Sequence, residues 1–148
     1  MQVFDRRDEL GPTKVIHVHE PSIGLMGIAV VDNVALGPAI GGMRMAPDVS
    51  FEECARLARA MTFKNAAAGL RHGGGKSVLV GDPRMPAARK ERLVRCFVAS
   101  LRELSEYIIG PDMGTDERCM AWVWDDEVPG LLKYCWEYRT HTDFLVDP

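Results

Sequence analysis

Residues 36–77 contain the most informative motifs of the chain, LGPAIGGMRM (36–45), MTFKNA (61–66) and GGGKS (73–77). Gly41 and Gly42 come before a helical segment, and a run of three glycines comes after it, just ahead of Lys76. Glycine has no Cβ, so backbone N–H groups can approach a small anion that a side chain would otherwise block. Together with Lys64 near the end of the helical segment, this stretch predicts a pocket for a small negatively charged molecule.

The rest of the chain alternates between strand-like and helix-like segments. Strands are predicted over residues 13–20, 25–32, 77–80 and 107–110, with a broken extended run over 34–44, and helices over 50–68, 86–104 and 116–127. Ser50 and Glu53 form a capping box for the first helix, and Thr115 is the expected cap of the last. The first two strands predict a hairpin. This pattern predicts an α/β fold, with three α/β/α layers and a mixed, mainly parallel sheet preceded by the N-terminal hairpin.

Length and composition favour one folded domain over residues 1–148, of which 131–148 show no clear period and stay unassigned. The net charge of −3 does not favour nucleic acid or an anionic membrane as partner. No apolar run reaches the ~18 residues of a membrane span, and the first residues lack the apolar core of a signal peptide. We therefore expect a cytoplasmic protein, whose four cysteines are buried or idle thiols.

Two motifs invite a metal or nucleotide interpretation that the spacing does not support. His17 and His19 would share one face of a strand, but without a third ligand nearby an edge strand is the simpler interpretation, and no metal site is expected. GGGKS resembles the end of a P-loop, yet Leu70 stands where that motif needs its first glycine, and a helix precedes it. The dinucleotide fingerprint Gly-x-Gly-x-x-Gly is also missing, so we expect no cofactor-binding residues in this chain.

Five motifs in consistent order give a family resemblance over about residues 34–115. GPAIGGMRM (37–45), MTFKNA (61–66), GGGK (73–76), GDP (81–83) and PDMGT (111–115) resemble the glutamate/leucine/phenylalanine/valine dehydrogenase family, specifically its N-terminal substrate-binding and dimerisation domain. The resemblance implies reversible oxidative deamination of an L-amino acid to a 2-oxo acid and ammonia. It also implies NAD or NADP, bound by a domain absent from this chain, and a homo-oligomer, a dimer or larger.

The resemblance assigns the substrate's head group to the glycine and lysine segments. It implies that Lys64 binds the α-carboxylate with help from Gly41 and Gly42, and that Met61 lines the pocket. Glutamate enzymes of the family carry a lysine just before this Gly-Gly, whereas Ile40 stands here. A carboxylate buried against Ile40 would lack a charged partner. We therefore expect a branched-chain or aromatic substrate, as in the leucine, phenylalanine and valine enzymes, in preference to glutamate.

The resemblance also implies two catalytic residues. Lys76 would activate the water that adds to the imine, which requires a pKa lowered by desolvation and by neighbouring Lys64. Asp112 would carry the proton to and from the substrate nitrogen. From the residues alone simpler interpretations stay open: Lys64 as a solvated helix-end lysine, Lys76 as a loop lysine, and Asp112 as a turn residue.

The family continues into a nucleotide-binding domain, for which this sequence has no counterpart. Two interpretations follow. The chain is either part of an amino-acid dehydrogenase, inactive by itself, or a stand-alone module that keeps the amino-acid pocket for binding or oligomerisation. A purely structural assembly domain would leave Lys64, Lys76 and Asp112 without a shared purpose.

Overall fold

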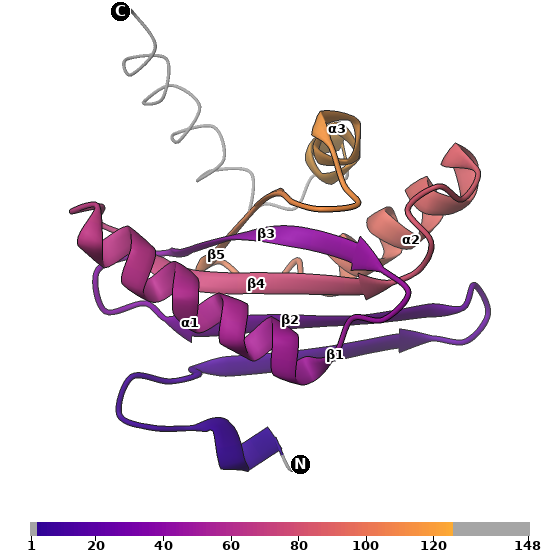
Figure 1. Cartoon of the computed structure of the whole chain (residues 1–148). Coiled ribbons are helices and arrows are strands. Elements are labelled where there is room, and N and C mark those ends of the chain that lie inside the picture. The colour runs from indigo at the N-terminus through magenta and orange to yellow at the C-terminus, as the bar shows by residue number, and fades with distance from the viewer. Residues whose placement is uncertain (1–2, 126–148) are drawn as a thin grey trace, which may run out of the picture.

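The computed structural model describes residues 3–125 and consists of a five-stranded sheet with helices on both faces (Figure 1). Its elements, in chain order, are a short 3-10 helix η1 (Val3–Arg6), β1 (Lys14–Glu20), β2 (Leu25–Asn33), β3 (Ala39–Ala46), α1 (Phe51–Ala67), β4 (Gly73–Val80), α2 (Ala87–Ser100), β5 (Tyr107–Pro111) and α3 (Glu117–Asp125). The unassigned segment 131–148 and the predicted end of the last helix lie outside the described residues.

The sheet has the strand order β1-β2-β4-β3-β5, with β4 at its centre. The hairpin strands β1 and β2 are antiparallel, and β2 is antiparallel to β4, whereas β3 runs parallel to both β4 and β5. This confirms the predicted α/β fold, its hairpin and its mixed sheet. Parallel pairings make up half of the sheet, because the hairpin joins the sheet directly through β2.

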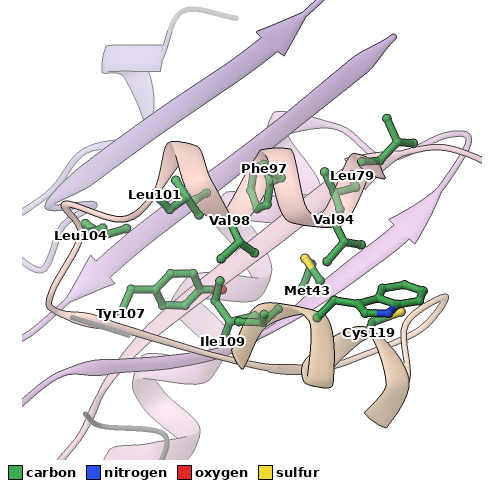
Figure 2. Packing of buried hydrophobic residues seen from close by; sticks show 14 of the residues in the cluster. Met43, Leu79, Val94, Phe97, Val98, Leu101, Leu104, Tyr107, Ile109 and Cys119 are labelled. Atoms are coloured by element: carbon green, nitrogen blue, oxygen red, sulfur yellow. The ribbon is translucent and has the colours of Figure 1, made fainter. Parts of the chain in front are cut away.

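Helix α1 covers one face of the sheet, and α2 and α3 cover the other (Figure 1). Neighbouring residues of a strand point to opposite faces, and Val78 and Leu79 of β4 accordingly belong to different clusters. Val78 packs with Cys54 and Ala58 of α1. Leu79 belongs to the larger cluster, which α2 and α3 complete with buried residues such as Val94, Phe97, Val98 and Cys119 (Figure 2).

Glycine in β4 allows α1 to lie directly on the sheet. A Cβ built at Gly74 would come within 2.1 Å of the Thr62 backbone nitrogen, so no side chain fits at this position. The buried side-chain amide of Asn65, in α1, donates a 2.7 Å hydrogen bond to the carbonyl of Gly73, the residue before Gly74 on β4. The C-terminal half of α1 is thereby fixed against the first residues of β4.

The glycine segments differ from their predicted surroundings. The strand predicted over 77–80 left the three glycines before Lys76 outside it, yet all of them belong to β4. Gly41 and Gly42 lie in the predicted extended run over 34–44 and form part of the regular strand β3. Ser50 caps α1 as expected, accepting a 3.2 Å bond from the Glu53 N–H. At α3 the Asp116 side chain, and not Thr115, accepts the bond from the Cys119 N–H.

The helices of the described part show no membrane span. Within residues 3–125, no helix combines the length and the apolar character that crossing a bilayer requires.

Candidate active site

Lys76 lies at the centre of the sheet, on the face that α1 covers. The β3–β4 register pairs Ile40 with Gly74, which brings Gly42 level with Lys76, and the β3–β5 register pairs Gly42 with Gly110. The lysine is only 6% exposed. Its side chain therefore has two glycine positions beside it on the same sheet face, neither of which carries a side chain of its own.

An ion pair joins Lys76 to Asp112, which follows directly after β5. The Lys76 ammonium contacts Oδ2 of Asp112, and the Nε of Arg44 donates to the same oxygen at 3.2 Å. Arg44 also reaches α1, where its guanidinium lies 2.5 Å from Oε1 of Glu53. The structure thus groups two cations and two carboxylates from β4, β3, α1 and the end of β5.

The turn that carries Asp112 is held against β3 by hydrogen bonds. The Asp112 N–H donates to Oγ1 of Thr115 at 3.0 Å, and this hydroxyl donates to the Met43 carbonyl at 2.6 Å. The Met45 N–H donates to the Met113 carbonyl at 2.9 Å. These bonds explain why Thr115 does not cap α3, because its hydroxyl is used to fix Asp112.

Asp112 is ionised at neutral pH in this setting. Burial favours the neutral carboxyl, but the hydrogen bond from Lys76 opposes it. The Met113 N–H and the charges of Lys76 and Arg44 act in the same direction, so the pKa of Asp112 lies below its ordinary value. The carboxylate can therefore accept a proton from a group that approaches it.

Tyr107 fixes the glycine segment of β3 from the opposite face. Its ring is fully buried among the residues of the larger cluster (Figure 2). Ser77 donates a 2.9 Å bond to the Tyr107 hydroxyl, which donates at 3.3 Å to the Gly41 carbonyl. Burial raises the pKa of this phenol, so it stays a neutral donor.

The two glycines beside Lys76 have different surroundings. A Cβ at Gly42 would lie 2.7 Å from Cβ of Asp112 and 2.8 Å from the Pro111 carbonyl oxygen, so Asp112 occupies the space above this glycine. A Cβ at Gly110 would meet nothing within 4 Å. The sheet face next to the ion pair is therefore open at Gly110.

The proposed substrate-binding residues lie on the same side of α1 and β3. Glu53 contacts Arg44 of β3, and Lys64 follows eleven residues later, about three turns along α1 and on nearly the same side of the helix. Lys64 is exposed, and its ammonium joins no ion pair with residues 3–125. Met61 and Ile40 are half-buried.

The structure brings together only part of the predicted set. Lys76, Asp112 and Gly42 are in one cluster, with Gly41 held behind it. The cation that shares Asp112 with Lys76 is Arg44 of β3, which is not among the site residues predicted from the sequence.

Sequence reasoning missed Arg44 and Gly110. Both carried a usable signal, because each lies two residues from a predicted site residue, Gly42 or Asp112, along the chain and therefore shares a strand face with it or lies close to it. No group of three metal-ligating side chains occurs among the residues that the structure describes.

Comparison with known proteins gives a consistent picture. The family model for the Glu/Leu/Phe/Val dehydrogenase dimerisation domain matches residues 12–127. Leucine dehydrogenase of Bacillus subtilis is 36% identical over 138 residues, which is 88% of this chain and 37% of that protein. Glutamate dehydrogenase B of Halobacterium salinarum is 40% identical over 140 residues, covering 82% of this chain and 32% of that protein.

Solved structures agree with this match. The hetero-hexameric glutamate dehydrogenase of Thermus thermophilus in a leucine-bound form has a TM-score of 0.74 and 36% identity, over 78% of this chain and 30% of that one. The L-tryptophan dehydrogenase of Nostoc punctiforme has a TM-score of 0.74 and 26% identity, over 84% of this chain and 38% of that one. The chain spans about a third of the length of the curated relatives it matches.

Proposed function

This chain belongs to the Glu/Leu/Phe/Val dehydrogenase family, as its N-terminal dimerisation domain, and we propose that it supplies the amino-acid site of an NAD(P)-dependent amino-acid dehydrogenase. The observation that carries the proposal is the ion pair between buried Lys76 and half-buried Asp112, beside Gly42. A lysine almost withdrawn from water and paired with a carboxylate is the arrangement that proton transfer to a bound amino acid requires.

The proposed chemistry begins with the head group of the substrate. Lys64, on the side of α1 towards β3, binds the α-carboxylate together with backbone N–H groups of Gly41 and Gly42. The α-amino group then lies at Asp112, whose ionised carboxylate accepts a proton from the substrate nitrogen. Met61 and Ile40 line the pocket.

The remaining steps use Lys76 and water. NAD or NADP, when held by a nucleotide-binding domain, would supply the hydride acceptor for Cα in this class of reaction, and the substrate would become a protonated imine. Lys76 removes a proton from the water that attacks the imine carbon, and Asp112 returns a proton to the nitrogen. The C–N bond of this addition product then breaks, the departing ammonia takes the remaining hydroxyl proton and leaves as ammonium, and the 2-oxo acid forms. The described residues carry no Gly-x-Gly-x-x-Gly motif and offer no fit for a dinucleotide. We therefore assign NAD or NADP to a domain other than the one described.

The surroundings of the site favour an apolar substrate side chain. Ile40 pairs with Ile108 across β3 and β5, and the next pair on this face is Gly42 with Gly110. The open space at Gly110 leaves room for a bulky group, and Ile40 gives a carboxylate no charged partner. We propose a branched-chain or aromatic L-amino acid in preference to glutamate.

A second function uses the same pocket without catalysis. The site for the amino-acid head group is complete without a dinucleotide motif, which is compatible with a stand-alone binding or oligomerisation module. Both functions predict amino-acid binding, but only the dehydrogenase predicts reduction of NAD or NADP when a nucleotide-binding domain of a relative is supplied. Absence of turnover in that mixture, with binding intact, would favour the module.

We also propose that the chain forms homo-oligomers, dimers or larger. The family model describes a dimerisation domain. Within the described residues, β1 is the outermost strand on its side of the sheet, so its outer edge could pair with a strand of another chain. Light scattering coupled to gel filtration would measure the mass. A monomer at high micromolar concentration would contradict this proposal.

Calorimetric titration of the full chain tests the amino-acid site. L-leucine, L-phenylalanine, L-glutamate and NAD are titrated separately into wild type, Lys64→Ala and a control, Arg56→Ala, which removes an exposed cation from the same helix. We expect leucine or phenylalanine to bind more tightly than glutamate. Lys64→Ala should weaken that binding by roughly tenfold or more, the loss expected for a charge-assisted hydrogen bond, while Arg56→Ala leaves it unchanged. Tighter binding of glutamate would refute the substrate class. Binding of no amino acid would refute both the dehydrogenase site and the binding module, and would favour a purely structural assembly domain.

A further inference from the structure

We propose that Arg44 is a positioning residue that, together with Glu53, fixes the Asp112 carboxylate and supplies its permanent counter-charge. The inference rests on the proposed function only in giving Asp112 a role in proton transfer. The contacts on which it is built belong to the structure itself.

The Arg44 guanidinium is held at both of its ends. Arg44 donates through Nε to Oδ2 of Asp112 at 3.2 Å, and its other end lies 2.5 Å from Oε1 of Glu53. A guanidinium is planar, so donors held at both ends fix the plane of the group. Arg44 is 18% exposed and Glu53 is 26% exposed, so water competes little for these contacts. The guanidinium therefore links Glu53 of α1 to Asp112 in the turn after β5 and fixes the position of that turn.

The Asp112 carboxylate needs a second cation when Lys76 takes part in chemistry. A lysine that acts as a base must spend part of the cycle without its proton, and in that state it no longer balances Asp112. A buried carboxylate without a cation is costly. Arg44 shares Oδ2 with Lys76 and keeps its proton at every working pH. Asp112 therefore keeps a counter-charge when Lys76 is neutral.

The charged groups around Asp112 are consistent with Arg44 as its permanent counter-charge and Lys76 as the group that exchanges a proton. Lys76 of β4 and Arg44 of β3 contact the Asp112 carboxylate, and Glu53 of α1 contacts Arg44. Two further titratable side chains, Tyr107 of β5 and Cys54 of α1, are neutral, because burial raises the pKa of both, in Cys54 to about 12. Among the described residues, the charge at Asp112 is thus set by two cations, one of which is held by a second carboxylate.

The test is a pH titration of the full chain, in which carbon-13 NMR of the side-chain carboxyl groups reports the protonation of Asp112. Asp112→Asn identifies the signal by removing it. Arg44→Gln should raise the proton affinity of Asp112 about tenfold, because it removes one opposite charge in contact with the carboxylate. Glu53→Gln should lower the proton affinity, because it leaves Arg44 to Asp112 alone. Arg56→Gln, an exposed cation on α1, should change nothing.

Arg44→Gln and Glu53→Gln should change the proton affinity of Asp112 in opposite directions, which separates this role from a structural one. A merely structural brace predicts that both variants lose stability and leave the proton affinity of Asp112 unchanged. The proposal is overturned if Asp112 titrates identically in Arg44→Gln and wild type, or if both variants change its proton affinity in the same direction. If Arg44→Gln does not fold, Arg44→Lys and Glu53→Gln decide. Lysine keeps the charge but cannot bridge both carboxylates, so it should raise the proton affinity less than tenfold.

The outcome is independent of the proposed function. Failure of the amino-acid site appears as absent leucine binding to the wild-type chain, whereas failure of the present inference appears in a titration performed without any ligand.

Discussion

Replacing Gly42 by alanine tests the packing of the site most sharply, because the neighbouring strand offers a matched control. The new Cβ would lie 2.7 Å from Cβ of Asp112 and 2.8 Å from the Pro111 carbonyl oxygen, and ordinary contact begins at 3.4 Å. Asp112 must therefore retreat by about 0.7 Å. The same methyl group at Gly110, which pairs with Gly42 across β3 and β5, meets nothing within 4 Å.

The expected size of the effect follows from these distances. The atoms in the way belong to the backbone and to the first side-chain carbon, which cannot rotate aside, so Gly42→Ala should cost about 1–3 kcal/mol of unfolding free energy. The Arg44–Asp112 bond is already 3.2 Å long, near the limit for an N–H···O bond, and a displacement of this size is enough to break it. Gly110→Ala should be neutral or stabilise by up to about 1 kcal/mol, because glycine is unfavourable inside a strand.

Urea unfolding followed by circular dichroism measures both variants, and the NMR titration of Asp112 reports on the ion pair. The reasoning predicts that Gly42→Ala is less stable than Gly110→Ala and that its Asp112 binds a proton more tightly than in wild type. Equal stabilities, with the Asp112 titration of Gly42→Ala unchanged, would refute it.

Three further outcomes follow from contacts away from the ion pair. Asn65→Leu should lose about 1–3 kcal/mol in urea unfolding, because the Gly73 carbonyl loses its buried donor, and a loss below 0.5 kcal/mol, roughly that of a surface change, would contradict this. The hydrogen bond from Arg59 lowers the pKa of Asp8 to about 2; a lowered folded-state pKa contributes stability above the unfolded value of about 4 that is lost as pH falls towards 2. The melting temperature of Asp8→Asn should therefore fall less steeply than that of wild type over this range, and parallel curves would contradict it. Burial raises the pKa of Cys54 to about 12, so iodoacetamide should alkylate this thiol only after unfolding, as mass spectrometry of the digested chain would show; rapid labelling of the native chain would exclude the buried position.

The fold was accessible from local sequence patterns wherever one rule dominated. The capping serine at Ser50 and the apolar spacing of 86–104 predicted α1 and α2, because the apolar side of an amphipathic helix must be buried. The hairpin was likewise predicted from its two β-rich runs. The family resemblance, drawn from short motifs, is confirmed by the match over residues 12–127.

The glycine-rich strand was not accessible in the same way. A run of three glycines before a lysine is typical of a loop, and only tertiary contacts explain why it forms the start of the central strand. A side chain at Gly74 would collide with Thr62 of α1, and one at Gly75 would collide with the Tyr107 ring, 2.7 Å away. These contacts join residues far apart in the sequence, so no local pattern contains them.

The candidate site shows the same limit. Lys76 and Asp112 are 36 residues apart and were linked only through the resemblance, whereas Arg44 was overlooked although it lies inside a quoted motif. Its importance depends on the β3–β5 pairing, which brings the end of β5 beside it. The sequence alone could not supply that pairing.

The most direct measurement is a crystal structure of this chain with L-leucine bound. The account predicts the α-carboxylate at Lys64 and the Gly41–Gly42 backbone, the amino group at Asp112 and Lys76, and the side chain over Ile40 and Gly110. Leucine bound elsewhere on the molecule, with Lys76 and Asp112 still paired and untouched, would contradict it.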